Sequence, residues 1–112
     1  MKPVALYYLA LLDEIRACAR GLGYAVGLHG SLSRDFDLIA CPWTKEAVAG
    51  DVLVEAIARL VGGASRMEHV AQKPHGRKAW VIWLHDDEAR RIKGTTPYID
   101  LSVMPLTQTD SE

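Results

Sequence analysis

Residues 24–41 read YAVGLHGSLSRDFDLIAC, and this stretch decides the fold class. The apolar run 24–28 predicts a β-strand that leads into a tight turn containing a Gly-Ser pair. The run 36–41 predicts a second strand, which ends at Pro42 because proline has no N–H to donate to a β-ladder. The stretch therefore predicts two strands joined by a glycine-containing turn.

Helices are predicted on both sides of these strands along the chain. Pro3 suits the first turn of a helix, and apolar residues recur at helical spacing until the glycines at 21 and 23. Thr44 is the predicted N-cap of a second helix, which ends at 62–63. The apolar stripe predicted for this second helix consists of Val48, Val52, Ile57, Leu60 and Val61.

The rest of the sequence predicts a larger sheet. Strands are expected over 67–71, 79–85 and 98–104, and the polar connection 86–96 has room for one helical turn. An order of helix, strand, strand, helix and then two or three strands is typical of an α/β (α+β) fold. We therefore expect a mixed β-sheet with helices packed on it.

The composition is that of an ordinary globular chain, with 49% apolar and 24% charged residues and a net charge of −1. This charge gives no general attraction for polyanions, so any contact with nucleic acid would be local. A chain of 112 residues supports one core, and we expect a single domain over 1–105 with a disordered tail over 106–112. Cys18 and Cys41 lie in apolar sequence, which predicts reduced core thiols of a cytoplasmic protein. No apolar run reaches the roughly 18 to 20 residues that span a bilayer, so we expect no membrane partner.

Asp35 and Asp37 are the first candidate site residues. In an extended segment, residues i and i+2 point to the same face, so the two carboxylates are expected side by side. Like charges so placed repel each other, and a hard cation such as Mg²⁺ or Mn²⁺ offsets the repulsion. The alternative is a solvated pair at the start of a strand, and the spacing alone leaves both interpretations open.

Asp100 is the third candidate. It lies within Tyr98-Ile99-Asp100-Leu101-Ser102-Val103, where alternate apolar residues predict that Ile99, Leu101 and Val103 face the core. Asp100 then shares the opposite face with Tyr98 and Ser102. If this strand neighbours the first acidic strand, three carboxylates converge on one metal site, which is an arrangement suited to phosphoryl transfer. An edge-strand acid facing water is the alternative.

The turn before the acids has the residues of a phosphate site. Gly30 allows a ligand to approach the backbone closely, and the turn at Ser31 presents N–H groups to an anion. Ser33 adds a hydroxyl and Arg34 adds a positive charge.

Several other residues have two open interpretations. Trp43 could stack under a base or cap the core, and His29 could contact phosphate or be structural. Trp80 and Trp83 differ in parity along their strand, so they face opposite sides of the sheet. The basic residues could meet the phosphates of an acceptor or could simply be solvated; they are Lys73, His75, Arg77, Lys78, Arg90, Arg91 and Lys93.

These residues together resemble the minimal nucleotidyltransferase domain of the DNA polymerase beta superfamily. The matching text is Leu28-His29-Gly30-Ser31, then 34–39 with its Asp-x-Asp pair, then Ile99-Asp100-Leu101. The resemblance extends from the first helix to the last strand. The chain is also similar to small proteins of phage and prophage origin.

The resemblance implies a metal-dependent transfer of a nucleoside monophosphate from a nucleoside triphosphate to a hydroxyl, with release of pyrophosphate. Asp35, Asp37 and Asp100 would be the catalytic metal ligands for Mg²⁺ or Mn²⁺, with Asp100 also the candidate general base. Gly30 and Ser31 would hold the terminal phosphates. The hydroxyl acceptor, a protein, a small molecule or an RNA end, would be selected with the help of a second subunit or a partner protein.

One departure from the family pattern bears on activity. Family members carry a longer stretch between the Gly-Ser turn and the acid pair, whereas only Leu32, Ser33 and Arg34 intervene here. The short connection favours an alternative, a catalytically inactive module of the same fold that binds nucleotide or a partner protein. The set of three acids favours the enzyme. A metal-dependent phosphohydrolase would use the same acids with water as the acceptor.

Overall fold

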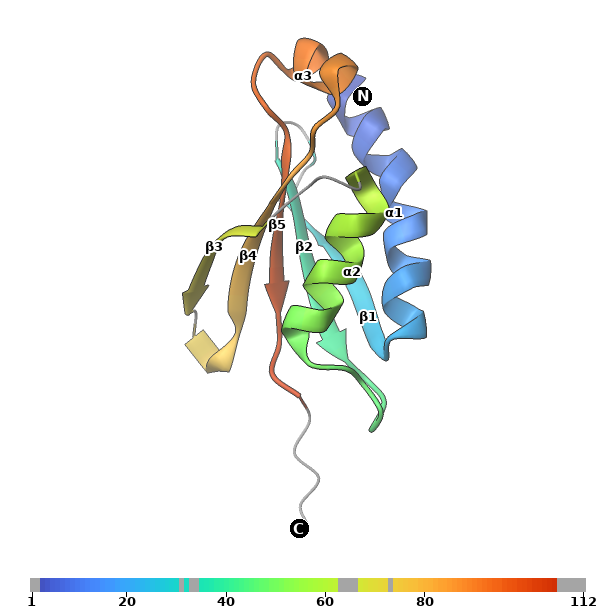
Figure 1. Cartoon of the computed structure of the whole chain (residues 1–112), viewed down its shortest axis with the longest axis vertical. Helices are drawn as coiled ribbons and strands as arrows, with labels where there is room; N and C mark the ends of the chain where they lie inside the picture. Colours follow the sequence, from blue (N-terminus) through green and yellow to red (C-terminus); the bar gives the residue numbers. More distant parts are fainter. Residues whose placement is uncertain (1–2, 31, 33–34, 63–66, 73, 107–112) are drawn as a thin grey trace.

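The computed structural model describes residues 3–30, 32, 35–62, 67–72 and 74–106 (Figure 1). The helices are α1 (Pro3–Gly21), α2 (Gly50–Gly62) and α3 (Asp87–Lys93), with a short 3₁₀ turn at Pro74–Gly76. The strands are β1 (Tyr24–His29), β2 (Phe36–Pro42), β3 (Met67–Gln72), β4 (Lys78–Trp83) and β5 (Tyr98–Val103). Within these ranges no helix combines the length and the apolar character needed to span a bilayer.

The strands form one mixed sheet in the order β1-β2-β5-β4-β3. Of the neighbouring strands in the described ranges, β2 and β5 run parallel and the others are antiparallel. Helices α1 and α2 lie side by side against one face of the sheet, and α3 lies at one end, beside the start of α1 (Figure 1). The α+β class and the mixed sheet expected from the sequence are therefore confirmed, and β5 lies directly beside the acid-bearing strand β2.

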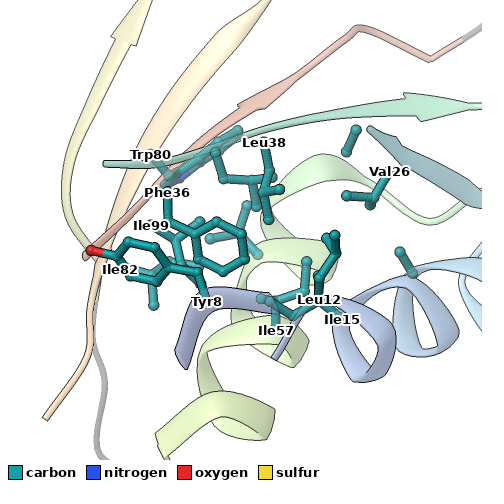
Figure 2. Close-up of a cluster of buried hydrophobic side chains, with 14 of the residues drawn as sticks. Tyr8, Leu12, Ile15, Val26, Phe36, Leu38, Ile57, Trp80, Ile82 and Ile99 are labelled. Atoms are coloured by element: carbon teal, nitrogen blue, oxygen red, sulfur yellow. The ribbon is translucent and has the colours of Figure 1, made fainter. Parts of the chain in front are cut away.

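The core lies between the sheet and the two long helices. Tyr8 of α1 stacks on Phe36 of β2 with ring centroids 4.7 Å apart, and both side chains are fully buried (Figure 2). Apolar residues at alternate positions of the central strands complete this layer; they include Leu38, Ala40, Trp80, Ile82, Ile99, Leu101 and Val103. We call this side of the sheet the covered face.

The opposite side of the sheet, which we call the open face, has no helix over it among the described elements (Figure 1). Its side chains on β1, β2 and β5 are exposed or half-buried. Cys41 belongs to this face and is exposed, so its predicted place in the core is wrong, whereas Cys18 of α1 is half-buried. The parity of β2 explains the difference, because Cys41 alternates with the buried Ala40.

The predicted start of the second helix at Thr44 is also wrong, since α2 begins at Gly50. The preceding segment is held instead by the end of α1 and the start of β1. Trp43 N–H donates to Gly23 O at 3.0 Å, and Val48 N–H donates to Leu22 O at 3.1 Å. A Cβ on Gly23 would lie 2.5 Å from Ala47 Cα, so only glycine permits this approach.

The later start of α2 also changes its buried stripe. The side chains that face the core are Leu53, Val54, Ile57 and Ala58, whereas Val52 and Leu60 are exposed. Of the predicted stripe, Ile57 is fully buried and Val48 and Val61 pack partly against the core. The connection before β5 forms a longer helix than expected, because the Asp86 carboxylate accepts the Ala89 N–H at 2.9 Å and so caps α3.

Candidate functional site

The predicted acids Asp37 and Asp100 lie directly opposite each other on the parallel strands β2 and β5. Antiparallel pairing adds His29 of β1 opposite Asp37 and Val81 of β4 opposite Asp100. These four residues form one row across the open face, which we call the acid row, with neighbouring strands about 4.8 Å apart. Both carboxyl side chains are half-buried.

Asp35 lies immediately before β2 and is exposed. It is close enough to raise the pKa of Asp37, so the three predicted acids do come together electrostatically. Among the described residues, however, no group of three or more His, Cys, Asp or Glu side chains is arranged to hold a metal ion. The acids are therefore neighbours that do not form a closed ligand cage.

The carboxylates give this part of the open face a negative field. Burial is the main cause that raises the pKa of Asp37, followed by the charges of Asp100 and Asp35, while His29 acts in the opposite direction. Burial and the same three acids also raise the pKa of Tyr98. A bound cation would relieve this repulsion, because it favours the ionised form of each carboxyl.

The Gly30 backbone, directly after β1, lies against the acid row. Gly30 has a φ of +90°, and a Cβ at this position would lie 3.4 Å from Oδ2 of Asp37. Leu32 also has a positive φ, of 66°, and its side chain is buried in the core. The other predicted phosphate-binding residues, Ser31, Ser33 and Arg34, lie outside the described residues. The Gly30 backbone is therefore the described part of this connection that lies beside the Asp37 carboxylate.

A groove of about 250 Å³ surrounds the acid row on the open face. Its lining residues are His29, Asp37, Leu38, Ile39, Arg77, Asp100 and Ser102. The sequence located Arg77 in a basic turn and left open whether this residue meets the phosphates of an acceptor or is solvated. It stands two residues before Ala79, which pairs with Ser102, so its position in the groove follows once the strand order is known. The groove thus combines two carboxylates with one permanent positive charge.

A larger cavity of about 480 Å³ lies where β4 begins and β5 ends, near the start of α2. Gly50, Lys78, Trp80 and Val103 contribute to its lining, and none of the three predicted acids does. We place the candidate site in the smaller groove, because the larger cavity lacks the paired carboxylates.

Trp43 does not line the groove or the larger cavity. Its side chain is 67% exposed, so the interpretation of this residue as a core cap is wrong. It follows the far end of β2, about 20 Å along the strand direction from Asp37 at ~3.3 Å per residue. This distance also separates it from any nucleotide held at the acids.

The donor atoms of the acid row suit a hard divalent cation. Mg²⁺ is commonly held by one or two carboxylates and completes its shell with water and phosphate oxygens. Asp37 and Asp100 provide such a pair. Neither acid takes part in the ion pairs seen between described residues, which are Arg59–Glu55 and Arg91–Glu88.

A scan against protein-family models and a search of curated proteins both found no match.

Proposed function

We propose that this chain is a metal-dependent nucleotidyltransferase with a nucleotidyltransferase-like fold. The observation that carries the proposal is the direct pairing of Asp37 with Asp100 on parallel strands of an open sheet face. Asp35, Asp37 and Asp100 would hold Mg²⁺ or Mn²⁺. The bound ion would offset the negative charge that develops on the phosphoryl oxygens.

The protein's own groups would mainly position the reactants. The Arg77 guanidinium would hold the phosphates of a nucleoside triphosphate beside the acid row, and the Gly30 backbone, which has no side chain, would leave room for the ligand next to Asp37. The acceptor hydroxyl oxygen would bond to the α-phosphorus as the bond to the bridging oxygen breaks and pyrophosphate leaves. The hydroxyl proton would pass to a carboxylate oxygen of Asp100.

A second candidate is an inactive module of the same fold that binds a nucleotide or a partner protein. It is favoured by the short β1–β2 connection and by the lack, among described residues, of a three-ligand metal group. A phosphohydrolase would use the same acids with water as the acceptor.

The test is to incubate the chain with Mn²⁺ or Mg²⁺ and each α-labelled nucleoside triphosphate, together with candidate protein, small-molecule and RNA acceptors. The proposed enzyme releases pyrophosphate and transfers the label. Release without transfer to any acceptor identifies a hydrolase, and metal-dependent binding without release identifies the inactive module.

Asp37→Asn tests the site itself, because it removes one charge with almost no change in size. The matched control is Asp13→Asn, which removes the same charge from an exposed position on α1. We expect Asp37→Asn to abolish metal-dependent turnover, and Asp13→Asn to leave it unchanged. Equal turnover in both variants would exclude the acid row as the site.

A further inference from the structure

The open face carries an aromatic pair directly beside the acid row. Trp83 of β4 is paired in register with Tyr98 of β5, and their ring centroids are 5.1 Å apart. Both side chains are half-buried. The Nζ of Lys93 lies 4.9 Å from the centre of the Tyr98 ring, which connects the pair to α3.

This pair adjoins the acids along β5. Tyr98 precedes Asp100 by two residues on the same face, a separation of about 6.6 Å. The rings therefore border the acid row on the side away from Ser102.

The opposite side of the acid row has a different chemistry. Ser102 follows Asp100 by two residues on the open face, and both line the same groove as Arg77. In the direction of β5 the open face therefore presents aromatic rings, then carboxylates, then a hydroxyl and a guanidinium. A nucleotide has a matching order, with a planar base at one end and phosphates at the other.

We propose that a nucleoside triphosphate lies lengthwise along β5, with its base on the Trp83–Tyr98 pair and its terminal phosphates toward Arg77. This inference rests on the proposed function and assigns the base subsite and the direction of the ligand. Aromatic rings stack on bases of every kind, so the pair favours base-bearing ligands over baseless ones more than it distinguishes among bases.

The experiment compares the affinity of two probes in the presence of Mg²⁺. One probe is ATP, which carries a base, and the other is inorganic triphosphate, which does not. Calorimetry on the full chain gives both dissociation constants. We expect the wild-type protein to bind ATP about tenfold more tightly than inorganic triphosphate, in line with the stacking of one base.

Two variants test separately the subsite for the base and the subsite for the phosphates. Trp83→Leu is expected to remove most of the preference for ATP and to leave the binding of inorganic triphosphate unchanged. Arg77→Gln is expected to weaken both probes about tenfold, through loss of charge-assisted hydrogen bonds, and to keep the preference. Trp43→Leu is the matched control, because Trp43 is exposed and remote from the groove, and it should change neither constant.

The remaining outcomes would overturn either the base subsite or the proposed function. Equal affinity of the wild-type protein for both probes, or an equal loss of both in Trp83→Leu, would overturn the base subsite while leaving the proposed function standing. Loss of label transfer without loss of ATP affinity in Trp83→Leu would assign the rings to the acceptor and also overturn it. If the wild-type protein binds neither probe, the proposed function itself fails. Circular dichroism checks folding, and Tyr98→Leu and Trp83→Phe replace Trp83→Leu if that variant does not fold.

Discussion

The strand β5 separates two surfaces with opposite physical character. On the covered face, Ile99, Leu101 and Val103 have at most 4% of their surface exposed. On the open face, Tyr98 and Asp100 alternate with them and remain half-buried, with Asp100 opposite the like charge of Asp37. One strand thus contributes to the hydrophobic core and to the candidate site.

The two faces contribute with opposite sign to the stability of the folded chain. Burial of apolar area on the covered face stabilises the native chain. Like charges directly opposite each other on a sheet destabilise it. The covered face is therefore explained by folding alone, whereas the facing carboxylates oppose folding, and in the proposed function a bound cation would offset their repulsion.

The largest effect that tests this contrast is expected from Leu101→Ala. Removing a fully buried leucine side chain leaves a cavity in the core and should lower the free energy of unfolding by about 3 kcal/mol. Urea denaturation followed by circular dichroism measures the change. Ser102→Ala is the matched control on the open face and should stay within about 0.5 kcal/mol of wild type. Similar losses in both variants would contradict the division into two faces.

Much of the fold could be predicted because its signals are local. The alternation of polar and apolar residues in 98–103 correctly assigned Asp100 to the face opposite Ile99 and Leu101. The start of α2 could not be predicted, because it depends on hydrogen bonds from the Trp43 and Val48 backbone to residues near the end of α1. From the sequence alone Thr44 is a plausible helix N-cap, because the hydrogen-bond partners of its neighbours are distant along the chain.

The candidate site was less predictable than the fold. Its acids were identifiable from residue type and spacing, but their adjacency depended on the pairing of β2 with β5, which are separated by about half of the chain. Arg77 and the ring pair of Trp83 with Tyr98 depend on the same non-local strand order. Spacing within β5 places Tyr98 beside Asp100, but it cannot reveal Arg77 or Trp83, because each of these comes from another strand or loop.

A smaller effect is expected from Gly30→Ala, at the edge of the open face. The φ of +90° is unfavourable for any residue with a Cβ, although the added atom would meet Asp37 Oδ2 only at 3.4 Å, an ordinary contact distance. We expect a loss of about 1 kcal/mol in unfolding free energy, from backbone conformation. Gly27→Ala is the control, because Gly27 lies in the preceding strand β1 and a Cβ there meets nothing within 4 Å. Equal losses would show that the Gly30 conformation is not the cause.

Asp100→Asn is expected to change the free energy of unfolding by less than Gly30→Ala does, and to raise it rather than lower it. Removing one of two facing charges should raise the free energy of unfolding by roughly 0.2–1 kcal/mol in the absence of metal. The same variant should lose the stabilisation that Mn²⁺ gives to the wild-type chain, because it lacks a ligand. Thermal denaturation with and without Mn²⁺ measures both, and a destabilised variant that keeps its response to Mn²⁺ would contradict the proposed role of the acid row.

The smallest expected effect is on the pH dependence of folding, because it comes from one group. The folded-state pKa of Asp37 is raised above its ordinary value of 3.8, chiefly by burial and then by Asp100 and Asp35. The folded chain therefore holds this proton more tightly than the unfolded chain does. The contribution of Asp37 to stability is present below pH 3.8 and is lost as the pH rises through the folded-state pKa.

Other carboxyl groups titrate in the same range, so the informative quantity is the difference in unfolding free energy between the wild-type chain and Asp37→Asn. Without metal, this difference should shift against the wild-type chain as the pH rises from 3.8, and then become constant. With saturating Mg²⁺ the slope should reverse, because the ion binds only the ionised carboxylate. A difference that is flat without metal would show that the neighbours of Asp37 do not destabilise its charge. A slope that Mg²⁺ leaves unchanged would show that repulsion is present on the open face but that no cation relieves it.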